Sequence, residues 1–332
     1  MVRNEYVAKT SKSPVAVVRT ALAVAERALP AYSHRCSPKK FTQHQLFACL
    51  VLKNFLKTDY RGVCSCLCDC PALRECLGLE HVPHYTTLQK AAQRLLVSRF
   101  ARKLLNETVR LQLGRRQKIA CAAIDSTGLE CTMASSYFVR RRAQVGGPWK
   151  KMVYHRFPKL SVICDVASHF ILAFAAHRGP KPDIDEFKSL LDDALGRVRL
   201  ATIVADGGYD SESNHVHARK VRGVRTVIPP VHGRPTSKPA RGYHRRLMQV
   251  RFDQHAYRNR GQVETVISMI KRRQGAHVRG MKYHSQRRSL GLMVLTHNIM
   301  ILLRRKVFYR ARKSPFVLPF LNLKCPFHPP LT

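Results

Sequence analysis

The stretch YRNRGQVETVISMIKR, residues 257–272, contains one acidic residue, Glu264, among four basic ones. Successive residues of an α-helix are about 100° apart, so residue spacing shows which side chains share a face. One arc is apolar and consists of Val263, Val266, Ile267 and Ile270. The arc beside it consists of Tyr257, Arg260, Glu264 and Lys271. The spacing predicts a helix that packs through its apolar stripe and presents a Tyr/Arg/Glu/Lys stripe next to it.

Two interpretations of Glu264 are open from this stretch alone. Arg260 and Glu264 have the spacing of an intrahelical ion pair. Alternatively, the carboxylate reaches toward another part of the fold. The 120 residues from Ser213 onward contain 26 Lys and Arg but only two acids, Asp253 and Glu264. Because an ion-pair face usually carries more than one acid, this surplus of cations favours the second interpretation.

The charge of the whole chain points to a polyanionic partner. The chain has 332 residues, 45% of them hydrophobic, and a formal net charge of +39. Such a charge repels itself in a compact protein, and phosphate contacts account for much of the affinity in protein–nucleic acid complexes. The Lys and Arg are spread along the chain and not gathered on one amphipathic helix, which favours nucleic acid over an anionic membrane surface.

Nothing in the sequence indicates a secretory leader or a membrane span. The first residues are polar, and the apolar run GLMVLTHNIMILL is too short to cross a bilayer and contains His297 and Asn298. We expect a soluble intracellular protein, cytoplasmic and associated with the nucleoid, that does not engage a membrane.

Residues 1–112 form an expected helical domain. Thr86 and Gln89 have the spacing of a capping box, which predicts a helix start there. A helix-turn-helix-like DNA-binding module and a plain helical bundle are both open. The segment VCSCLCDCPALREC, residues 63–76, holds five cysteines, between positions 64 and 76, in a spacing unlike a structural zinc site. We interpret them as reduced, partly buried thiols on helices, with a soft-metal or redox role as the alternative.

Residues 115–306 alternate between strand and helix patterns, which predicts an α/β domain. Within it we expect a loop over 229–250, Asp183 as a helix N-cap, and His215 and His217 on the surface. Residues 307–332 form a basic, Pro-rich tail.

Two strand-like runs end in aspartate. IACAAID ends at Asp125 and TIVAD ends at Asp206. Open α/β sheets place their sites at strand ends, and two carboxylates brought together there repel each other unless a cation lies between them. An aspartate before a Ser or Gly turn is also common without any function, so each motif alone is weak.

Taken together, these motifs resemble the bacterial insertion-sequence DDE transposases. The spacing of Tyr257, Arg260, Glu264 and Lys271 is similar to the signature of that family without a gap. AIDSTGLE and VADGGYDSE resemble its two aspartate segments, and LTHNIMILL resembles its closing helix. The resemblance extends over roughly residues 40–306.

The resemblance implies an RNase H-like catalytic core, with a mixed sheet flanked by helices, preceded by the helical domain. It implies that Asp125, Asp206 and Glu264 are catalytic and hold two Mg²⁺ or Mn²⁺ ions, and that Tyr257, Arg260 and Lys271 contact DNA. The implied reaction is hydrolysis at transposon ends followed by attack of the freed 3′-hydroxyl on target double-stranded DNA, by a homodimer on DNA. The alternatives are a transposase-derived DNA-binding protein without cleavage, and a related nuclease without strand transfer.

Overall fold

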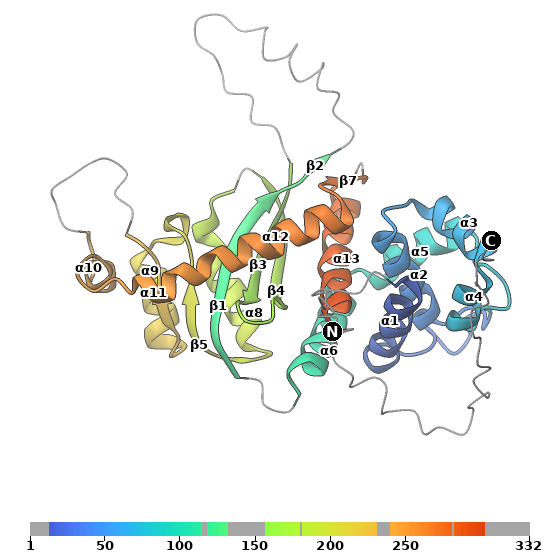
Figure 1. Cartoon of the computed structure of the whole chain (residues 1–332), viewed down its shortest axis with the longest axis horizontal. Coiled ribbons are helices and arrows are strands. Elements are labelled where there is room, and N and C mark those ends of the chain that lie inside the picture. Colours follow the sequence, from blue (N-terminus) through green and yellow to red (C-terminus); the bar gives the residue numbers. More distant parts are fainter. Residues whose placement is uncertain are drawn as a thin grey trace, which may run out of the picture.

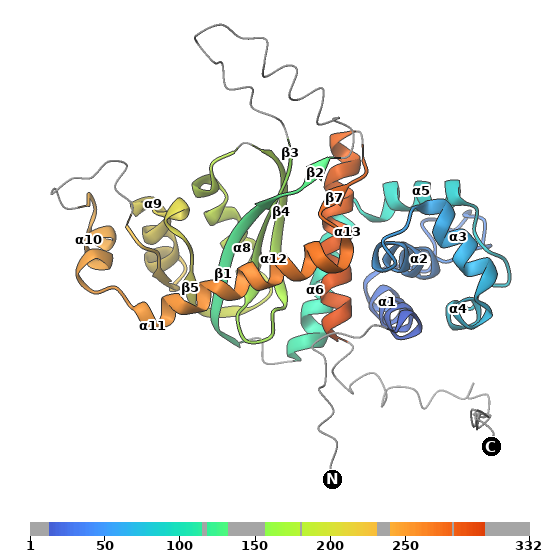
Figure 2. The same cartoon turned by 45° about the horizontal axis from the view of Figure 1, so that its top comes forward.

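The computed structural model describes residues 13–114, 118–131, 157–179, 181–230, 240–280 and 282–302. The expected tail at 307–332 lies outside these ranges. In both views, α6 and α13 stand between a sheet and a body of helices α1–α5 (Figures 1 and 2).

The first part of the chain is helical, as predicted. Its helices are α1 (Pro14–Ala28), α2 (Gln43–Phe55), α3 (Tyr60–Asp69), α4 (Pro71–Leu77), α5 (Tyr85–Leu95) and α6 (Ser98–Leu113). The predicted capping box is wrong: α5 starts without a side-chain cap, and the Thr86 hydroxyl hydrogen-bonds to the ring of His84. A true capping box forms at α2, where Thr42 and Gln45 bond reciprocally to each other's backbone N–H.

The cysteine-rich segment forms α3 and α4, in line with its predicted helical character. Cys64, Cys66, Cys70 and Cys76 are half-buried free thiols, while Cys68 is exposed. Burial raises the pKa of Cys64 and of Cys66, which keeps these thiols protonated.

The second part of the chain builds the sheet. Its strands are β1 (Lys118–Gly128), β2 (Glu130–Cys131), β3 (Phe157–Asp165), β4 (Ile171–Gly179), β5 (Arg199–Val204), β6 (Arg225–Val227) and β7 (His277–Val278). The main sheet has the order β4-β3-β1-β5-β6, with β3 antiparallel to β1 and β4, and with β5 parallel to β1 and β6. This mixed sheet, flanked by helices and preceded by a helical region, confirms the predicted α/β fold class.

The helices that follow the strands flank this sheet. They are α8 (Phe187–Leu195), α9 (Glu212–Val216), α10 (Tyr243–Val250), α11 (Gln254–Tyr257), α12 (Gly261–Gln274) and α13 (Tyr283–Leu302). Helix α12 packs across β1 and β3 and crosses in front of the sheet in Figure 1. Val263, Val266 and Ile270 are buried in this contact, so the predicted apolar stripe is confirmed.

The stretch 257–272 is not one continuous α-helix. Tyr257 ends α11, a 3₁₀ turn covers Arg258–Arg260, and α12 begins at Gly261. The tighter 3₁₀ turn rotates Tyr257 away from the position that a regular helix would give it. The spacing of Arg260 and Glu264 is unaffected, because α12 continues regularly from there.

Three local expectations are wrong. Residues 243–250 are helix α10 and not loop. His215 is fully buried, with its ring bonded to the Thr226 hydroxyl at 2.6 Å. Asp183 does not cap α8, which begins at Phe187, but forms an ion pair with the buried Lys159 at 2.7 Å. In each case a tertiary partner, distant in sequence, overrides the local pattern.

Helix α13 joins the two parts of the molecule. Asn298 on this helix is fully buried and bonds to the backbone N–H and C=O of Ile171 at 2.9 Å each, which holds α13 to the start of β4. His297 hydrogen-bonds to the carbonyl of His169 at 2.9 Å. Within the described residues, no helix combines the length and apolar character that crossing a membrane requires.

We predict that His297 makes stability fall in mild acid. Burial lowers the pKa of His297 from 6.5 to about 4. The folded state therefore keeps this ring neutral, whereas the unfolded chain takes up a proton below pH 6.5. The stabilisation is complete above pH 6.5 and is lost as the pH falls toward 4, by about 2 kcal/mol at pH 5.

Urea unfolding at pH 7.5 and pH 5 measures this effect. Wild type should lose about 2 kcal/mol more than His297→Gln between the two pH values. An equal loss in both proteins would show that His297 does not titrate on unfolding.

Candidate active site

The sheet register brings Asp125 and Asp206 side by side. Ala123 on β1 pairs with Val204 on β5, and each aspartate lies two residues further along its parallel strand. Strand β5 ends at Val204, so Asp206 lies where its chain leaves the sheet, while β1 continues to Gly128 along β3. The two carboxylates therefore meet at the carboxyl end of the parallel strands.

Local backbone groups orient both carboxylates. The N–H of Ser126 donates to Asp125 Oδ1 at 2.7 Å, and the N–H of Gly208 donates to Asp206 Oδ1 at 2.9 Å. A Cβ at Gly208 would lie 3.0 Å from that same oxygen, so this position favours a glycine. These bonds leave Oδ2 of each aspartate pointing to a shared space.

The guanidinium of Arg260 occupies this shared space. Its Nη2 lies 3.9 Å from Asp125 Oδ2 and 3.7 Å from Asp206 Oδ2, and its Nη1 donates to Glu264 Oε1 at 2.7 Å. Both interpretations of Glu264 thus hold in one arrangement: it pairs with Arg260 within the helix, and it reaches the edge of the sheet that carries the two aspartates.

Burial and like charge act together on Asp125. The pKa of Asp125 is raised to about 6, first by burial and also by the carboxylates of Asp206 and Glu264, while the Ser126 N–H and Arg260 oppose the rise. The Asp125 side chain is 16% exposed, against 36% for Asp206 and 55% for Glu264. The site is therefore a set of acids that requires a cation, open to solvent on the Glu264 side.

The other two residues of the stretch lie on either side of this centre. The Tyr257 ring packs edge-on against Phe252, with 5.1 Å between the ring centroids. Tyr257 also lies close enough to Arg260 to contribute to the raised pKa of that guanidinium. Lys271 is half-buried, two helical turns beyond Glu264, so it shares that face of α12 without reaching the carboxylates.

The donor chemistry of the three carboxylates fits a hard divalent cation. Carboxylate oxygens are the ligands that Mg²⁺ and Mn²⁺ prefer, and Asp125, Asp206 and Glu264 already share one cationic partner. Across the ranges that the structure describes, no three His, Cys, Asp or Glu side chains form a group that could hold a metal ion as they stand. The three carboxylates instead contact the Arg260 guanidinium.

Comparison with known proteins assigns this core to a family. The family model described as "Transposase DDE domain" matches residues 116–299, more than half of the chain. The chain belongs to the transposase DDE domain family. One similar solved structure is a cryo-EM structure of a piggyBac transposase synaptic complex with hairpin DNA, with a TM-score of 0.47 and 9% identity. That likeness covers 92% of this chain and 77% of the other. No curated protein matches the chain.

The transposase core contains supporting residues that the sequence did not single out. Tyr209 is fully buried, and burial raises its pKa strongly, with further contributions from Asp183, Asp125 and Asp206. The Tyr209 hydroxyl therefore stays protonated behind the two catalytic-site candidates. The sequence GGYD after Asp206 could have indicated the burial of Tyr209, because an aromatic residue in a turn at a strand end suggests packing under the turn.

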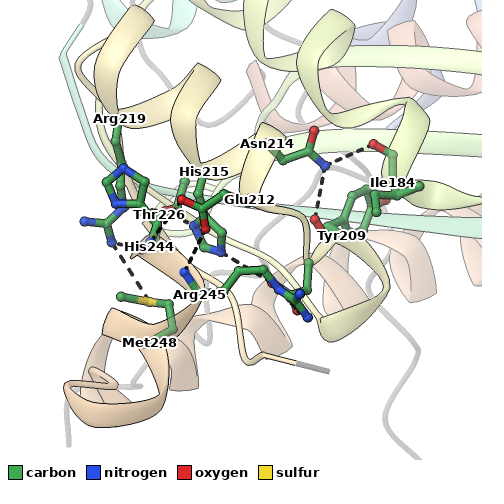
Figure 3. Close-up of polar contacts among 11 residues, drawn as sticks. Ile184, Tyr209, Glu212, Asn214, His215, Arg219, Thr226, His244, Arg245 and Met248 are labelled. Carbon is green, nitrogen blue, oxygen red and sulfur yellow. Dashed lines mark hydrogen bonds and ion pairs between the residues drawn. The ribbon is translucent and has the colours of Figure 1, made fainter. Parts of the chain in front are cut away.

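The same motif also anchors α10 (Figure 3). Glu212 accepts hydrogen bonds from the backbone N–H groups of His244 and Arg245 at 3.1 Å each, so a side chain from α9 caps the N-terminus of α10. Burial alone would raise the pKa of Glu212, but these two N–H groups hold it below its ordinary value. The Arg245 side chain forms an ion pair with Asp210 at 2.7 Å. The segment that follows Asp206 thus holds part of the connection to Glu264.

We predict that Gly242 is essential for this capping contact. Its backbone has φ +100° and ψ 149°, a region open almost only to glycine, and an added Cβ would overlap the Glu212 carboxylate. Gly242→Ala should cost about 2–3 kcal/mol of unfolding free energy, from strain plus the lost cap.

Gly223→Ala is the matched control. Gly223 also has positive φ, +68°, but nothing lies within 4 Å of its added Cβ. That change should cost only about 1 kcal/mol. Denaturant unfolding compares the two, and equal losses would mean that the Glu212 contact contributes nothing.

Proposed function

We propose that this transposase cuts the DNA phosphodiester backbone at the ends of its element, an insertion sequence, and joins the freed 3′-hydroxyl to target DNA. The observation that carries the proposal is the meeting of Asp125, Asp206 and Glu264 around one guanidinium, at the carboxyl end of the parallel strands. Two parts of the chain far apart in sequence thus supply one set of acids. A purely structural ion pair would need only one of them.

The three carboxylates would hold two Mg²⁺ or Mn²⁺ ions. When bound, such ions supply activation of the attacking oxygen and stabilisation of the leaving oxygen in an in-line displacement at phosphorus. Asp125 and Asp206 are set for this role by backbone N–H bonds that fix one oxygen and leave the other free. Glu264 is the most exposed of the three, and its rigid docking through α12 gives it a defined position.

The chain's own cations would position the DNA. Arg260 neutralises the carboxylates in this structure, and its guanidinium has the donor geometry to bind a phosphate beside them. Tyr257 and Lys271 flank it along the same stretch, so all three would contact the backbone near the cut end. Phosphate contacts of this kind fix the register of the duplex without reading its sequence.

The remaining assignments follow from this activity. The net charge of +39 supports double-stranded DNA as the partner, both element ends and target. We assign DNA binding to the helical domain, residues 1–112, and catalysis to residues 115–306. Two element ends must be processed together, which suggests a homodimer assembled on DNA. The bacterial cytoplasm, at the nucleoid, is where such a protein would act.

We predict that Glu264→Gln abolishes cleavage while DNA binding remains. The amide keeps the shape of the side chain but is a poor ligand for a hard cation. Cleavage should fall by more than about 100-fold, since loss of even an outer partner of a metal ligand costs 10–100-fold. The assay uses labelled duplexes that tile the DNA on both sides of the coding sequence, with Mg²⁺ or Mn²⁺.

Glu80→Gln is the matched control, because Glu80 is exposed in the helical part and its loss changes the net charge equally. Cleavage by wild type and by Glu80→Gln, but not by Glu264→Gln, supports the proposal. Binding without cleavage by wild type would favour a DNA-binding protein that has lost cutting. Cleavage without joining to a target duplex would favour a nuclease. Equal cleavage by Glu264→Gln would reduce Glu264 to an ion-pair partner of Arg260.

A further inference from the structure

The C-terminal end of α2 meets the C-terminal end of α12, although the two lie more than 200 residues apart in sequence. The Lys57 ammonium donates to the Arg272 carbonyl at 2.7 Å, and the Arg279 guanidinium donates to the Lys57 carbonyl at 3.3 Å. Beneath these bonds, the Asn54 side chain donates to that of Gln274. The cations gathered here, called the α2–α12 junction below, are Lys53, Lys57, Arg272, Arg279 and Arg288.

Among the residues that the structure describes, these cations have no acidic partner. Within the described ranges, no Asp or Glu oxygen lies within 4 Å of a junction cation. Asp59 is near enough to influence Lys53 and Arg279, but its Oδ1 accepts the N–H of Gly62 as the cap of α3. By contrast, Lys159 on β3 forms an ion pair with Asp183.

Among the junction cations, Lys53 shows most clearly that gathering positive charges here disfavours the charged form. Its ammonium lies 5.0 Å from the centre of the Tyr60 ring and is half-buried. The pKa of Lys53 is lowered to about 8, first by burial and also by the charge of Arg279, while Asp59 opposes the change. Burial raises the pKa of the Tyr60 phenol, and Arg288 lies close enough to Tyr60 for its charge to oppose that rise. A half-buried ammonium near a guanidinium group is stabilised by a bound anion.

We propose that the α2–α12 junction is a second DNA phosphate site, formed jointly by the helical part and the catalytic core. The inference rests on the proposed function, because it takes the partner to be the DNA that the core cuts. Lys53, Arg279 and Arg288 would surround one phosphate, while Lys57 and Arg272 hold the two helix ends together. The site would couple DNA binding by the helical part to the position of the core.

The geometry of α12 sets the distance of this site from the cut. Arg272 is eight residues beyond Glu264, which is about 12 Å along the helix. A duplex that follows α12 advances about 3.4 Å per base pair. For such a duplex, the Arg272 end of the junction lies roughly three to four base pairs along the DNA from the scissile phosphate.

The test measures duplex binding without divalent cations, in a Glu264→Gln background, so that no cutting occurs. Lys53→Met and Arg279→Gln each remove one junction cation. Arg279 is exposed, and its substitution removes one hydrogen bond, to the Lys57 carbonyl. Lys188→Met is the control, because Lys188 is exposed on α8 and its substitution removes the same single positive charge. Each junction variant should bind about fivefold more weakly at 0.15 M salt and reduce the slope of log K against log salt by about 0.9.

Duplexes with one neutral methylphosphonate locate the contact. A methylphosphonate three or four base pairs from the cut should weaken wild type and leave Arg279→Gln unchanged. The proposal is wrong if both junction variants bind like Lys188→Met, even if wild type cleaves DNA. The junction proposal survives if wild type fails to cleave DNA but the junction variants bind DNA more weakly. The cleavage proposal and the junction proposal can therefore fail independently. Displacement of DNA by millimolar inorganic phosphate in wild type, but not in the variants, would overturn the DNA assignment in favour of a free anion.

Discussion

Carboxylates at the same register on neighbouring parallel strands repel each other, and this repulsion constrains the rest of the molecule. Asp125 and Asp206 are forced together by the pairing of Ala123 with Val204, and the pKa of Asp125 is raised to about 6 by burial first and by its acidic neighbours next. Such a pair persists in a folded core with a cation beside it or with a proton on one of its members. In this structure the guanidinium of Arg260 provides that charge.

The position of α12 depends on contacts at both of its ends. Asp253 caps α11 and forms an ion pair with Arg225 of β6 at 2.6 Å, which fixes the approach to Arg260. At the other end, Gln274 donates to the carbonyl of Met293 on α13 at 3.0 Å. Of the two acids in the basic last third of the chain, Asp253 therefore has a structural role, and Glu264 faces the site. A helix held so firmly can present a carboxylate to the sheet edge without a supporting loop.

Much of the site follows from local pattern. The apolar spacing of Val263, Val266 and Ile270 predicts which face of α12 packs, and a strand that ends in aspartate predicts where Asp125 and Asp206 lie. What the sequence leaves undetermined is set by tertiary partners. Residues 243–250 are polar and follow Pro- and Gly-rich sequence, so they resemble a loop, yet Glu212 caps them into a helix.

Direct binding of Mn²⁺ to the DNA-free protein, followed by electron paramagnetic resonance, tests the central claim that Asp125, Asp206 and Glu264 form one cation-binding centre. Wild type should bind Mn²⁺, Asp206→Asn should lose that binding, and Arg260→Gln should bind Mn²⁺ more tightly because the competing guanidinium is gone. Equal Mn²⁺ binding by wild type and Asp206→Asn, with no gain in Arg260→Gln, would contradict the account.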